Sequence, residues 1–396
     1  MKIVPHSREQ ARWVYNGRPF RSQKKIRDYV RFLRGDSGVG WSRLHRQSCG
    51  ARPAAFGYEV VLYDNLSTGF RRLARGFELV EGDIADEATL RPVLARVDAV
   101  MHFAAYAYVG ESVENPRKYF RNNVLAALSL LNSALDAGIR RFVFSSTCAV
   151  YGIPEQIPIT EQTPREPVNP YGASKLFFEN ALEAYSRAYG LRSVSLRYFN
   201  AAGADESGEI GEIHDPETHL IPLALAASAT NGPELQIYGS DYPTPDGTCV
   251  RDYIHVNDLA DAHVRALQYL ETHRPEKSRD ENGESLAVNL GTGRGHSVLE
   301  IIQAVENATG RPVRRTVGPR RPGDPPVLVA DPAKAQRVLG WMAKRSLDDI
   351  VSSAWRWWVH HTKRRILNVA GVEDRQEFFE VVEHRGPVPS WRKGKG

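Results

Sequence analysis

Tyr171 and Lys175 are the residues of this chain whose types and spacing most directly indicate chemistry. They lie four positions apart, so they share one face if the segment is helical. An ammonium close to a phenol favours the phenolate and lowers the phenol pKa from about 10 toward neutrality. Such a pair makes a general base for a sugar or alcohol hydroxyl. Because this spacing is common, an accidental surface pair is the alternative.

Thr147 strengthens this interpretation. It follows residues 141–146, an apolar segment typical of a strand that is buried on both faces. A helix is predicted over residues 176–189, just after Lys175. Ligands of open α/β sheets bind at the carboxyl ends of strands. Thr147 is therefore expected to hydrogen-bond the reacting hydroxyl beside Tyr171.

These residues need a scaffold, and the pattern from residue 57 onward supplies one. Short apolar runs predict strands, and longer amphipathic segments between them predict helices. Strands are expected at 58–63, 77–81, 99–103, 141–146 and 193–198, and helices at 87–97, 122–137, 176–189, 258–270, 298–309 and 347–360. The alternation indicates βαβ units and a parallel sheet.

A series of motifs in fixed order resembles the extended short-chain dehydrogenase/reductase family, and within it the UDP-glucose 4-epimerases. The motifs span about residues 57–360 and include Asp64-Asn-Leu-Ser-Thr-Gly69, His102-Phe-Ala-Ala105, Ser145-Ser-Thr147, Tyr171-Gly-Ala-Ser-Lys175, Arg197-Tyr-Phe-Asn200 and Arg251-Asp-Tyr-Ile-His-Val256. The resemblance implies a Rossmann-type doubly wound parallel sheet with a smaller carboxyl-terminal substrate domain. It also implies NAD as cofactor and interconversion of UDP-glucose and UDP-galactose through a 4-keto intermediate, with Tyr171, Lys175 and Thr147 as the catalytic residues.

The resemblance also implies a set of NAD contacts. An acid after the second strand, here Asp64, accepts hydrogen bonds from the adenosine ribose and repels a 2′-phosphate, which favours NAD. Simple turn chemistry is the alternative for Asp64 and Asp83, and helix-surface polarity is the alternative for Asn123. The expected cofactor-binding residues are Asp64, Asn65, Asp83, Ile84, Phe103, Ala104, Asn123, Tyr171, Lys175 and Tyr198.

A second set is expected to hold the UDP sugar. Arg251 and Arg321 match the family's clamps on the diphosphate, and a guanidinium fork suits phosphate oxygens. A solvated surface arginine is the alternative for each. By resemblance, Asp324 contacts the uridine ribose and Asn200 a phosphate. The expected substrate-binding residues are Thr147, Asn200, His219, Leu220, Tyr238, Arg251, Arg321 and Asp324.

The segment before residue 57 breaks the pattern. Residues 1–56 carry a net charge of +10, whereas the rest of the chain carries −5. A Rossmann half needs a glycine-rich turn about 20 residues before the ribose-binding acid, where backbone N–H groups receive the pyrophosphate. Gly35, Gly38 and Gly40 lie in that region, but we find no β-rich run before them and no helix-opening run after them.

A shifted reading frame explains the missing turn. One nucleotide out of frame, the junction of Trp41 and Ser42 must encode glycine, and the junctions across residues 36–50 permit Ile-Leu-Val-Ser-Gly-Gly-Ala-Gly-Tyr-Ile-Gly-Ser-His-Val. That string has the character of a first strand and phosphate loop, at the required distance from Asp64. We hypothesise that residues 36–56 are a frame-scrambled phosphate loop. Nucleotide sequence across this region tests the hypothesis, since a reading without two compensating shifts contradicts it.

The chain is therefore expected to have four parts. They are an atypical basic extension (1–35), an NAD-binding Rossmann domain (36–200), a UDP-sugar-binding part interleaved with it (201–361) and a polar tail (362–396). Three cysteines without metal-ligand pairing predict no disulfide framework and no metal site, in a reducing, cytoplasmic setting. No apolar run approaches the roughly 20 residues of a membrane span. A UDP sugar and a second copy of the chain, in a homodimer, are the expected partners; nucleic acid and membrane are not.

Three alternatives stay open. The chain is a 4-epimerase of another UDP sugar (UDP-xylose/arabinose or a UDP-N-acetylhexosamine), a catalytically impaired pseudo-epimerase, or a nucleic-acid binder that uses its basic segment. The last ranks lowest because no aromatic-interleaved basic face supports it. Leu328, at a position that the resemblance links to tolerance of N-acetylated sugars, is of intermediate size. Cys148 and Ala149 follow Thr147 where related dehydratases carry an acidic pair, which disfavours dehydration.

Overall fold

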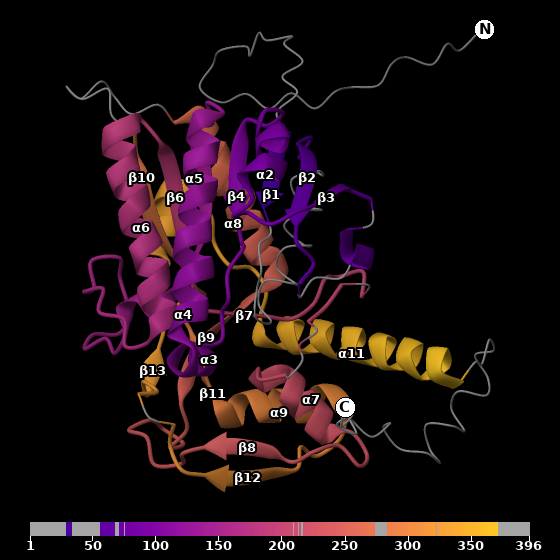
Figure 1. Cartoon of the computed structure of the whole chain (residues 1–396). Coiled ribbons are helices and arrows are strands. Elements are labelled where there is room, and N and C mark those ends of the chain that lie inside the picture. Colours follow the sequence, from indigo (N-terminus) through magenta and orange to yellow (C-terminus); the bar gives the residue numbers. More distant parts are fainter. Residues whose placement is uncertain are drawn as a thin grey trace, which may run out of the picture.

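The structure, a computed structural model, describes residues 29–33, 56–67, 71–74, 76–208, 210–212, 214, 217–273, 283–321 and 323–370. A large region with a central sheet lies above a smaller region of short strands and helices (Figure 1). No helix in the described part of the chain has the length and apolarity of a membrane span.

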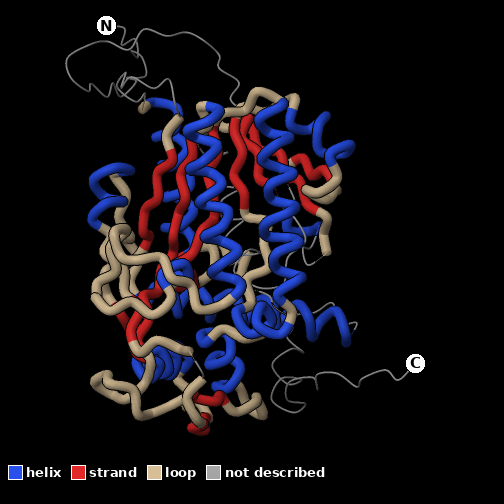
Figure 2. Tube along the Cα trace, turned by 60° about the vertical axis from the view of Figure 1, so that its left-hand side comes forward, coloured by secondary structure: helices blue, strands red, loops and turns tan. Residues whose placement is uncertain are grey.

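The large region is built on a seven-stranded, wholly parallel sheet, and Figure 2 shows its strands side by side with helices along them. This arrangement is the expected Rossmann-type parallel sheet, so the predicted fold class is confirmed. In spatial order the strands are β10 (Ser285–Leu290), β6 (Arg192–Tyr198), β5 (Arg141–Thr147), β4 (Ala99–His102), β1 (Tyr29–Leu33), β2 (Glu59–Asp64) and β3 (Glu78–Glu81).

Apolar cores lie on both faces of this sheet because successive strand residues point to opposite sides. In β4, Val100 joins the core under α2 (Glu87–Leu94), α5 (Ala127–Asp136) and α6 (Pro170–Tyr189). Met101 joins the core under α8 (Val256–Thr272) and α10 (Ala333–Leu339). Burial on both faces explains the continuous apolar runs that mark these strands in the sequence.

The smaller region has its own core between short strands and three helices. Its strands are β7 (Asn200–Ala202), β9 (Val250–His255), β11 (Gly295–Ser297) and β13 (Val327–Leu328), with a separate parallel pair, β8 (Leu235–Tyr238) and β12 (Arg315–Gly318). Its helices are α7 (Leu220–Ser228), α9 (Val298–Thr309) and α11 (Leu347–Ala370). The two regions share the chain, because β10 and α8 come from the second half and pack in the large region.

Short helical segments complete the described chain. They are η1 (Arg71–Ala74), α3 (Val109–Glu114), α4 (Pro116–Tyr119), η2 (Phe120–Ala126) and η3 (Cys148–Tyr151). The helix predicted over 122–137 is thus two pieces, a π-helical segment η2 followed by α5. A π-helical insertion of this kind frequently accompanies a functional site.

Two helix boundaries differ from the prediction. The helix α6 begins at Pro170, not after Lys175, because Asn169 caps it by accepting a hydrogen bond from Gly172 N at 2.9 Å, and Pro170 suits the first position. Tyr171 and Lys175 therefore both lie within the helix. The helix α11 continues to Ala370, so the first residues of the predicted tail are helical.

The expectation that no strand precedes Gly35 was wrong. Tyr29–Leu33 form β1 at the centre of the sheet, paired in parallel with β2 and with β4. The backbone pairing of a central position outweighs the arginine in this short run. The sheet thus begins before residue 36, the boundary predicted for the Rossmann domain. Residues 34–55 lie outside the described residues, and they include most of the scrambled segment (36–56). Residues 1–28 of the basic extension and 371–396 of the tail also lie outside them.

One buried charged pair joins the sheet to α6. Arg197 on β6 and Glu179 on α6 are each about 2% exposed, and Arg197 Nε donates to Glu179 Oε1 at 3.0 Å and to Oε2 at 3.2 Å. Burial alone would lower the pKa of Arg197, but Glu179 raises it. Arg197 Nη1 also donates to the Tyr151 hydroxyl at 2.9 Å, which in turn donates to Asn289 Oδ1 at 2.6 Å. The guanidinium therefore stays charged inside the protein.

We predict that Arg197→Met destabilises the protein by about 3–5 kcal/mol, because it leaves the buried Glu179 carboxylate with only the more distant, partly exposed Arg165, 3.6 Å away, as its cation. Urea denaturation followed by tryptophan fluorescence measures the change. Arg91→Met is the matched control, since Arg91 pairs with Glu87 at an exposed position on α2 and contributes about 0–1 kcal/mol. Equal stability of the two variants would contradict a structural role for the buried pair.

Candidate active site

The catalytic candidates meet where β5 ends and α6 begins. The Tyr171 side chain is hydrogen-bonded to Thr147. Gly172 allows this approach, because a Cβ there would lie 2.5 Å from the Ala149 carbonyl oxygen. Thr147 Oγ1 also accepts a hydrogen bond from Ala149 N at 3.2 Å, which fixes its side chain as the N-cap of η3. The structure thus brings together the phenol and hydroxyl that the sequence predicts.

Lys175 lies one turn after Tyr171 and is 3% exposed. Its Nζ donates to the Ser145 carbonyl oxygen at 2.8 Å and lies 4.9 Å from the centre of the Phe144 ring. Burial raises the pKa of Tyr171 to about 12, and its hydrogen bond with Thr147 lowers it only in part. The lowering of this pKa that Lys175 and the cationic nicotinamide are expected to produce together is therefore not reached in the protein without its cofactor.

Asn123, in η2, uses every hydrogen-bonding position of its amide within the protein. Its Oδ1 accepts from Tyr106 N at 2.8 Å and from Asn122 Nδ2 at 3.0 Å, and its Nδ2 donates to Tyr106 O at 2.9 Å and Ser174 Oγ at 3.0 Å. These contacts exclude simple surface polarity. They favour a role in positioning α6 over a direct contact to the cofactor.

Polar groups suited to a nucleotide line the carboxyl ends of β2 and β3. Asp64 is buried, and its Oδ1 accepts from Leu66 N at 2.7 Å. Asn65 Nδ2 donates to Asp83 Oδ2 at 3.0 Å, which ties the two strand ends together. Carboxylates at this edge match the hydroxyl and amine donors of adenosine. The donor and acceptor set of the described residues therefore fits the adenosine half of NAD, while the segment expected to hold the pyrophosphate is not described.

The remaining predicted cofactor residues lie at or after strand ends and are at most 9% exposed. Tyr198 ends β6, and its hydroxyl hydrogen-bonds Ser145 Oγ on the neighbouring strand. The others, Ile84, Phe103 and Ala104, follow β3 and β4. These positions place their backbone at the edge where ligands of parallel sheets bind.

The smaller region brings four predicted substrate residues into two contacts. Arg251 on β9 forms an ion pair with Asp324, and its Nη1 donates to Val250 O at 2.8 Å. The Arg321 guanidinium lies over the Tyr238 ring, 3.8 Å from its centre. The Arg251 guanidinium is thus not a freely solvated surface group, whereas Arg321 is exposed and packs on an aromatic ring. Leu328 pairs in register with Arg251 on the adjoining strand β13.

Electrostatic effects on Cys148 and Tyr253 link the two regions. Burial raises the pKa of the Cys148 thiol to about 12, and the nearby Arg251 charge partly lowers it. The Cys148 thiol also raises the pKa of Tyr171. Burial also raises the pKa of Tyr253, and hydrogen bonding with Asn200 opposes this. Tyr171 of the large region and Arg251 of the smaller region therefore both lie within electrostatic reach of Cys148.

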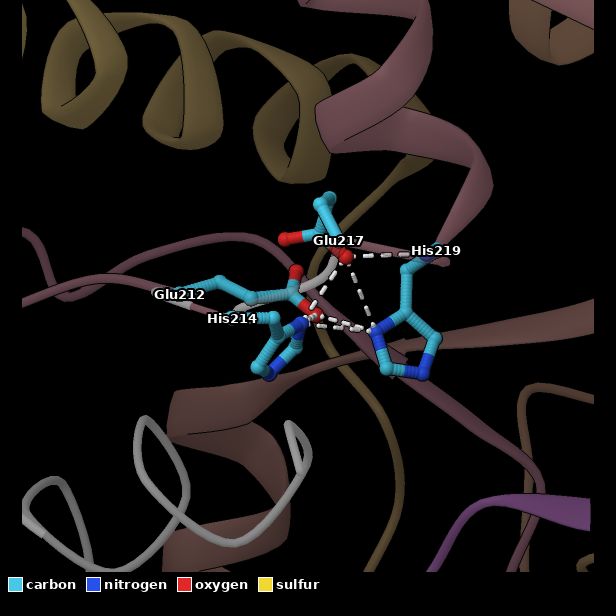
Figure 3. Close-up of side chains that lie close together, drawn as sticks. All are labelled: Glu212, His214, Glu217 and His219. Carbon is cyan, nitrogen blue, oxygen red and sulfur yellow. Dashed lines mark hydrogen bonds and ion pairs between the residues drawn. The ribbon is translucent and has the colours of Figure 1, made fainter. Parts of the chain in front are cut away.

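His219 and Leu220 stand at the start of α7, with His219 as the capping residue. His219 belongs to a compact group with Glu212, His214 and Glu217 (Figure 3). Burial would lower the pKa of His219, but the Glu212 and Glu217 carboxylates raise it to about 9. With no metal ion among these groups, the ring is thus cationic at neutral pH.

Sequence reasoning missed the residues behind the site. Glu179, Tyr151 and Asn289 form the buried network around Arg197, and Ser146 Oγ also donates to Glu179. A glutamate one helical turn past Lys175 was the available signal, because an acid on a buried helix face needs a partner. It also missed the repeated Glu-x-His pattern of the group around His219.

Comparison with known proteins agrees with this geometry. The sequence model of the "NAD dependent epimerase/dehydratase family" matches residues 51–279. The match begins within the scrambled segment, residues 36–56. The UDP-glucose 4-epimerase of Rhizobium meliloti is 51% identical over 313 residues, covering 78% of this chain and 92% of that protein.

Two solved structures share the fold. UDP-glucose 4-epimerase from Brucella ovis, in complex with NAD, is 49% identical with a TM-score of 0.76, covering 83% of this chain and 97% of its own. The Stenotrophomonas maltophila enzyme, with bound NAD and formylated UDP-arabinopyranose, is 38% identical with a TM-score of 0.78, covering 85% and 99%. The chain belongs to the NAD dependent epimerase/dehydratase family, and within it to the UDP-glucose 4-epimerases.

Proposed function

We propose that the protein interconverts UDP-glucose and UDP-galactose at carbon 4 of the hexose. The observation that carries the proposal is the Tyr171–Thr147 pair at the carboxyl end of β5, next to Cys148, whose thiol also senses the charge of Arg251 in the Arg251–Asp324 pair of the smaller region. The first pair is a proton-transfer site and the second a handle for a nucleotide diphosphate. The relatives named above carry the same activity in their names.

In this mechanism the Tyr171 phenolate takes the proton from O4 of the sugar, and Thr147 hydrogen-bonds the same oxygen. When bound, NAD⁺ would supply the acceptor for the C4 hydride and the donor that returns it to the opposite face of the 4-keto sugar, and its positive charge would favour the phenolate. Lys175, held by the Ser145 carbonyl, contributes a second positive charge on the same side. Tyr171 returns its proton to O4 after the sugar has turned.

The residues that bind UDP, which we call the UDP handle, must keep the nucleotide bound during the whole reaction, because the sugar turns while the nucleotide stays in place. Arg251 and Arg321 suit the diphosphate oxygens, Asp324 the uridine ribose and Asn200 a phosphate. His219, Leu220 and Tyr238 complete the proposed substrate contacts. The cofactor contacts are proposed at Asp64, Asn65, Asp83, Ile84, Phe103, Ala104, Tyr198, Lys175 and Tyr171, with Asn123 positioning α6 behind them.

A UDP-pentose is the second candidate substrate. The Stenotrophomonas structure with formylated UDP-arabinopyranose favours it, because that protein shares the fold over 85% of this chain. Both substrates use the same base and handle. Initial rates with UDP-galactose and UDP-xylose under identical conditions distinguish them.

We also propose that the protein is a cytoplasmic homodimer. Large apolar side chains are exposed on the adjoining segments η2 and α6, namely Phe120, Leu125 and Phe177 at 40–64% exposure. A second copy would cover them. Cys148 and Cys249 are free thiols, which suits a reducing compartment. Sedimentation equilibrium distinguishes dimer from monomer, and fluorescence microscopy of a tagged chain locates it.

Tyr171→Phe should lower turnover by at least the roughly 10²–10⁴ expected for the loss of acid–base catalysis. The variant keeps the ring and the UDP contacts, so UDP affinity should be unchanged. Coupled assay of UDP-galactose conversion and calorimetry with UDP measure the two quantities. Near-normal turnover would remove Tyr171 from the mechanism.

Arg251→Ala should weaken UDP binding by about 1.5–3 kcal/mol, the range for a hydrogen bond to a charged partner. The loss also leaves Asp324 facing the diphosphate without its cation. Calorimetry with UDP alone measures the affinity. Arg91→Ala, on the distant and exposed face of α2, is the control and should bind UDP like the parent. Equal affinity in Arg251→Ala would show that Arg251 is no clamp.

The segment after β1 should determine cofactor content. Trp41, Arg43 and Leu44 stand where the family's pyrophosphate turn needs small residues. Protein of this sequence should therefore purify with little NAD, and protein with the one-frame reading restored between Asp36 and Ala55 should retain it. Nicotinamide released on denaturation gives the stoichiometry. One NAD per chain in the present sequence would refute the frameshift account.

A further inference from the structure

Glu212, His214, Glu217 and His219 direct four possible ligand atoms at one point. Each offers one nitrogen or carboxylate oxygen, and these atoms all lie within 4.8 Å of one another (Figure 3). The four residues form two Glu-x-His pairs on the connection from β7 to α7, and we call them the Glu-His cluster. The sequence analysis predicted no metal site because it considered only cysteine pairs.

The distances within the Glu-His cluster are close to those of a tetrahedral metal site. His214 Nδ1 lies 2.8 Å from Glu217 Oε1, and His219 Nδ1 lies 2.7 Å from Glu212 Oε1. The two Nδ1 atoms are 3.2 Å apart, and the two remaining nitrogen–oxygen pairs are both 3.4 Å apart. Zn²⁺ binds such atoms at about 2.0–2.1 Å, so tetrahedral ligands are separated by about 3.3–3.4 Å. A small outward movement of the ligand atoms would admit the ion.

The neighbouring contacts orient the ligands. Glu217 Oε1 accepts from Thr218 N at 2.8 Å and from His219 N at 2.9 Å, and hydrogen-bonded carboxylates are usual around bound metals. The His214 side chain has no exposed surface, and its Nε2 has no hydrogen-bond partner among the described residues. The polar contacts of this buried imidazole therefore lie at Nδ1, inside the Glu-His cluster.

The helix α11 holds the backbone of the cluster in place. Trp357 Nε1 donates to the Glu212 carbonyl oxygen at 3.1 Å. A Cβ at Gly211 would lie 2.0 Å from the Trp357 ring, so only glycine lets the chain pass this close. His360 Nδ1 also lies 3.1 Å from the Gly208 carbonyl oxygen. The first half of the cluster is thus preorganised by contacts that involve none of the four ligand side chains.

We propose that the Glu-His cluster binds one Zn²⁺ ion through His214 Nδ1, His219 Nδ1 and one oxygen each of Glu212 and Glu217. Two carboxylates neutralise the ion, and two imidazoles favour Zn²⁺ over Mg²⁺ and Ca²⁺, which prefer oxygen ligands. No position is left open for water, so the site is structural. The ion joins the β7–α7 connection to the first turn of α7, where His219 and Leu220 lie. The proposal does not depend on the epimerase assignment.

The experiment uses the full untagged chain, stripped with EDTA and then incubated with Zn²⁺. Elemental analysis after desalting should give one zinc per chain, and Co²⁺ in its place should give the visible absorption of a tetrahedral complex. His214→Ala should weaken Zn²⁺ binding by about 100-fold or more, as the loss of a direct ligand exceeds the 10–100-fold typical of outer contacts. A chromogenic chelator competing for Zn²⁺ measures the affinity.

His273→Ala is the matched control, because His273 lies at the end of α8 beside Tyr269, outside the cluster. It should bind Zn²⁺ like the parent, as should Tyr171→Phe, which separates this proposal from the catalytic one. Glu217→Gln, which keeps the side-chain shape, replaces His214→Ala if that variant does not fold, and should also lose zinc. Absence of stoichiometric zinc in the parent would show that protons alone bridge these groups. A Zn²⁺ affinity equal to that of the parent in both His214→Ala and Glu217→Gln would show the same.

Discussion

The buried Arg197 guanidinium is the constraint on which the site depends. A charge taken out of water must be paired, and its hydrogen bonds must be satisfied. Arg197 meets this requirement with Glu179 from α6 and Tyr151 from η3, and Tyr151 extends the network to Asn289 on β10. Ser146, next to Thr147, donates to the same carboxylate. One cation therefore fixes α6 against β5, β6 and β10, and the relative position of Tyr171 and Thr147 follows from it.

The local sequence completes what this network begins. Asn169 and Pro170 start α6 just before Tyr171, so the phenol belongs to the first helical turn. Gly172 then lets the helix approach the Ala149 carbonyl, which a side chain would prevent. Asn123 fastens the other side of the same turn through Ser174. The residues around Tyr171, namely Asn169, Pro170, Gly172 and Ser174, thus each help to place it.

Much of this fold was predictable from the sequence, because strands buried on both faces leave apolar runs that end in polar residues. The nearness of Tyr171 to Thr147 was predictable in part, since Thr147 ends a strand at the edge of the sheet where ligands bind. The Arg197–Glu179 pair was missed, because each residue has the type of a surface charge and only the position of Glu179 one helical turn past Lys175 hints at burial. β1 was missed because Tyr29–Leu33 is short and contains an arginine, and its strand state depends on pairing with β2 and β4. The raised pKa of Tyr171 in the protein without cofactor was not foreseen, because its main cause is burial, which a sequence does not display.

A single residue connects the strand on the proposed cofactor side to the strand on the proposed substrate side. β6 ends at Tyr198 on the cofactor side, and β7 begins at Asn200 on the substrate side. Only Phe199 separates them; it is 3% exposed, and its N donates to the Leu290 carbonyl oxygen at 3.2 Å. A buried, hydrogen-bonded residue at this junction holds Tyr198 and Asn200, and with them the cofactor and substrate contacts proposed above, in a fixed relation. The sugar, joined to the handle through single bonds, is then the one part of the complex that must rotate.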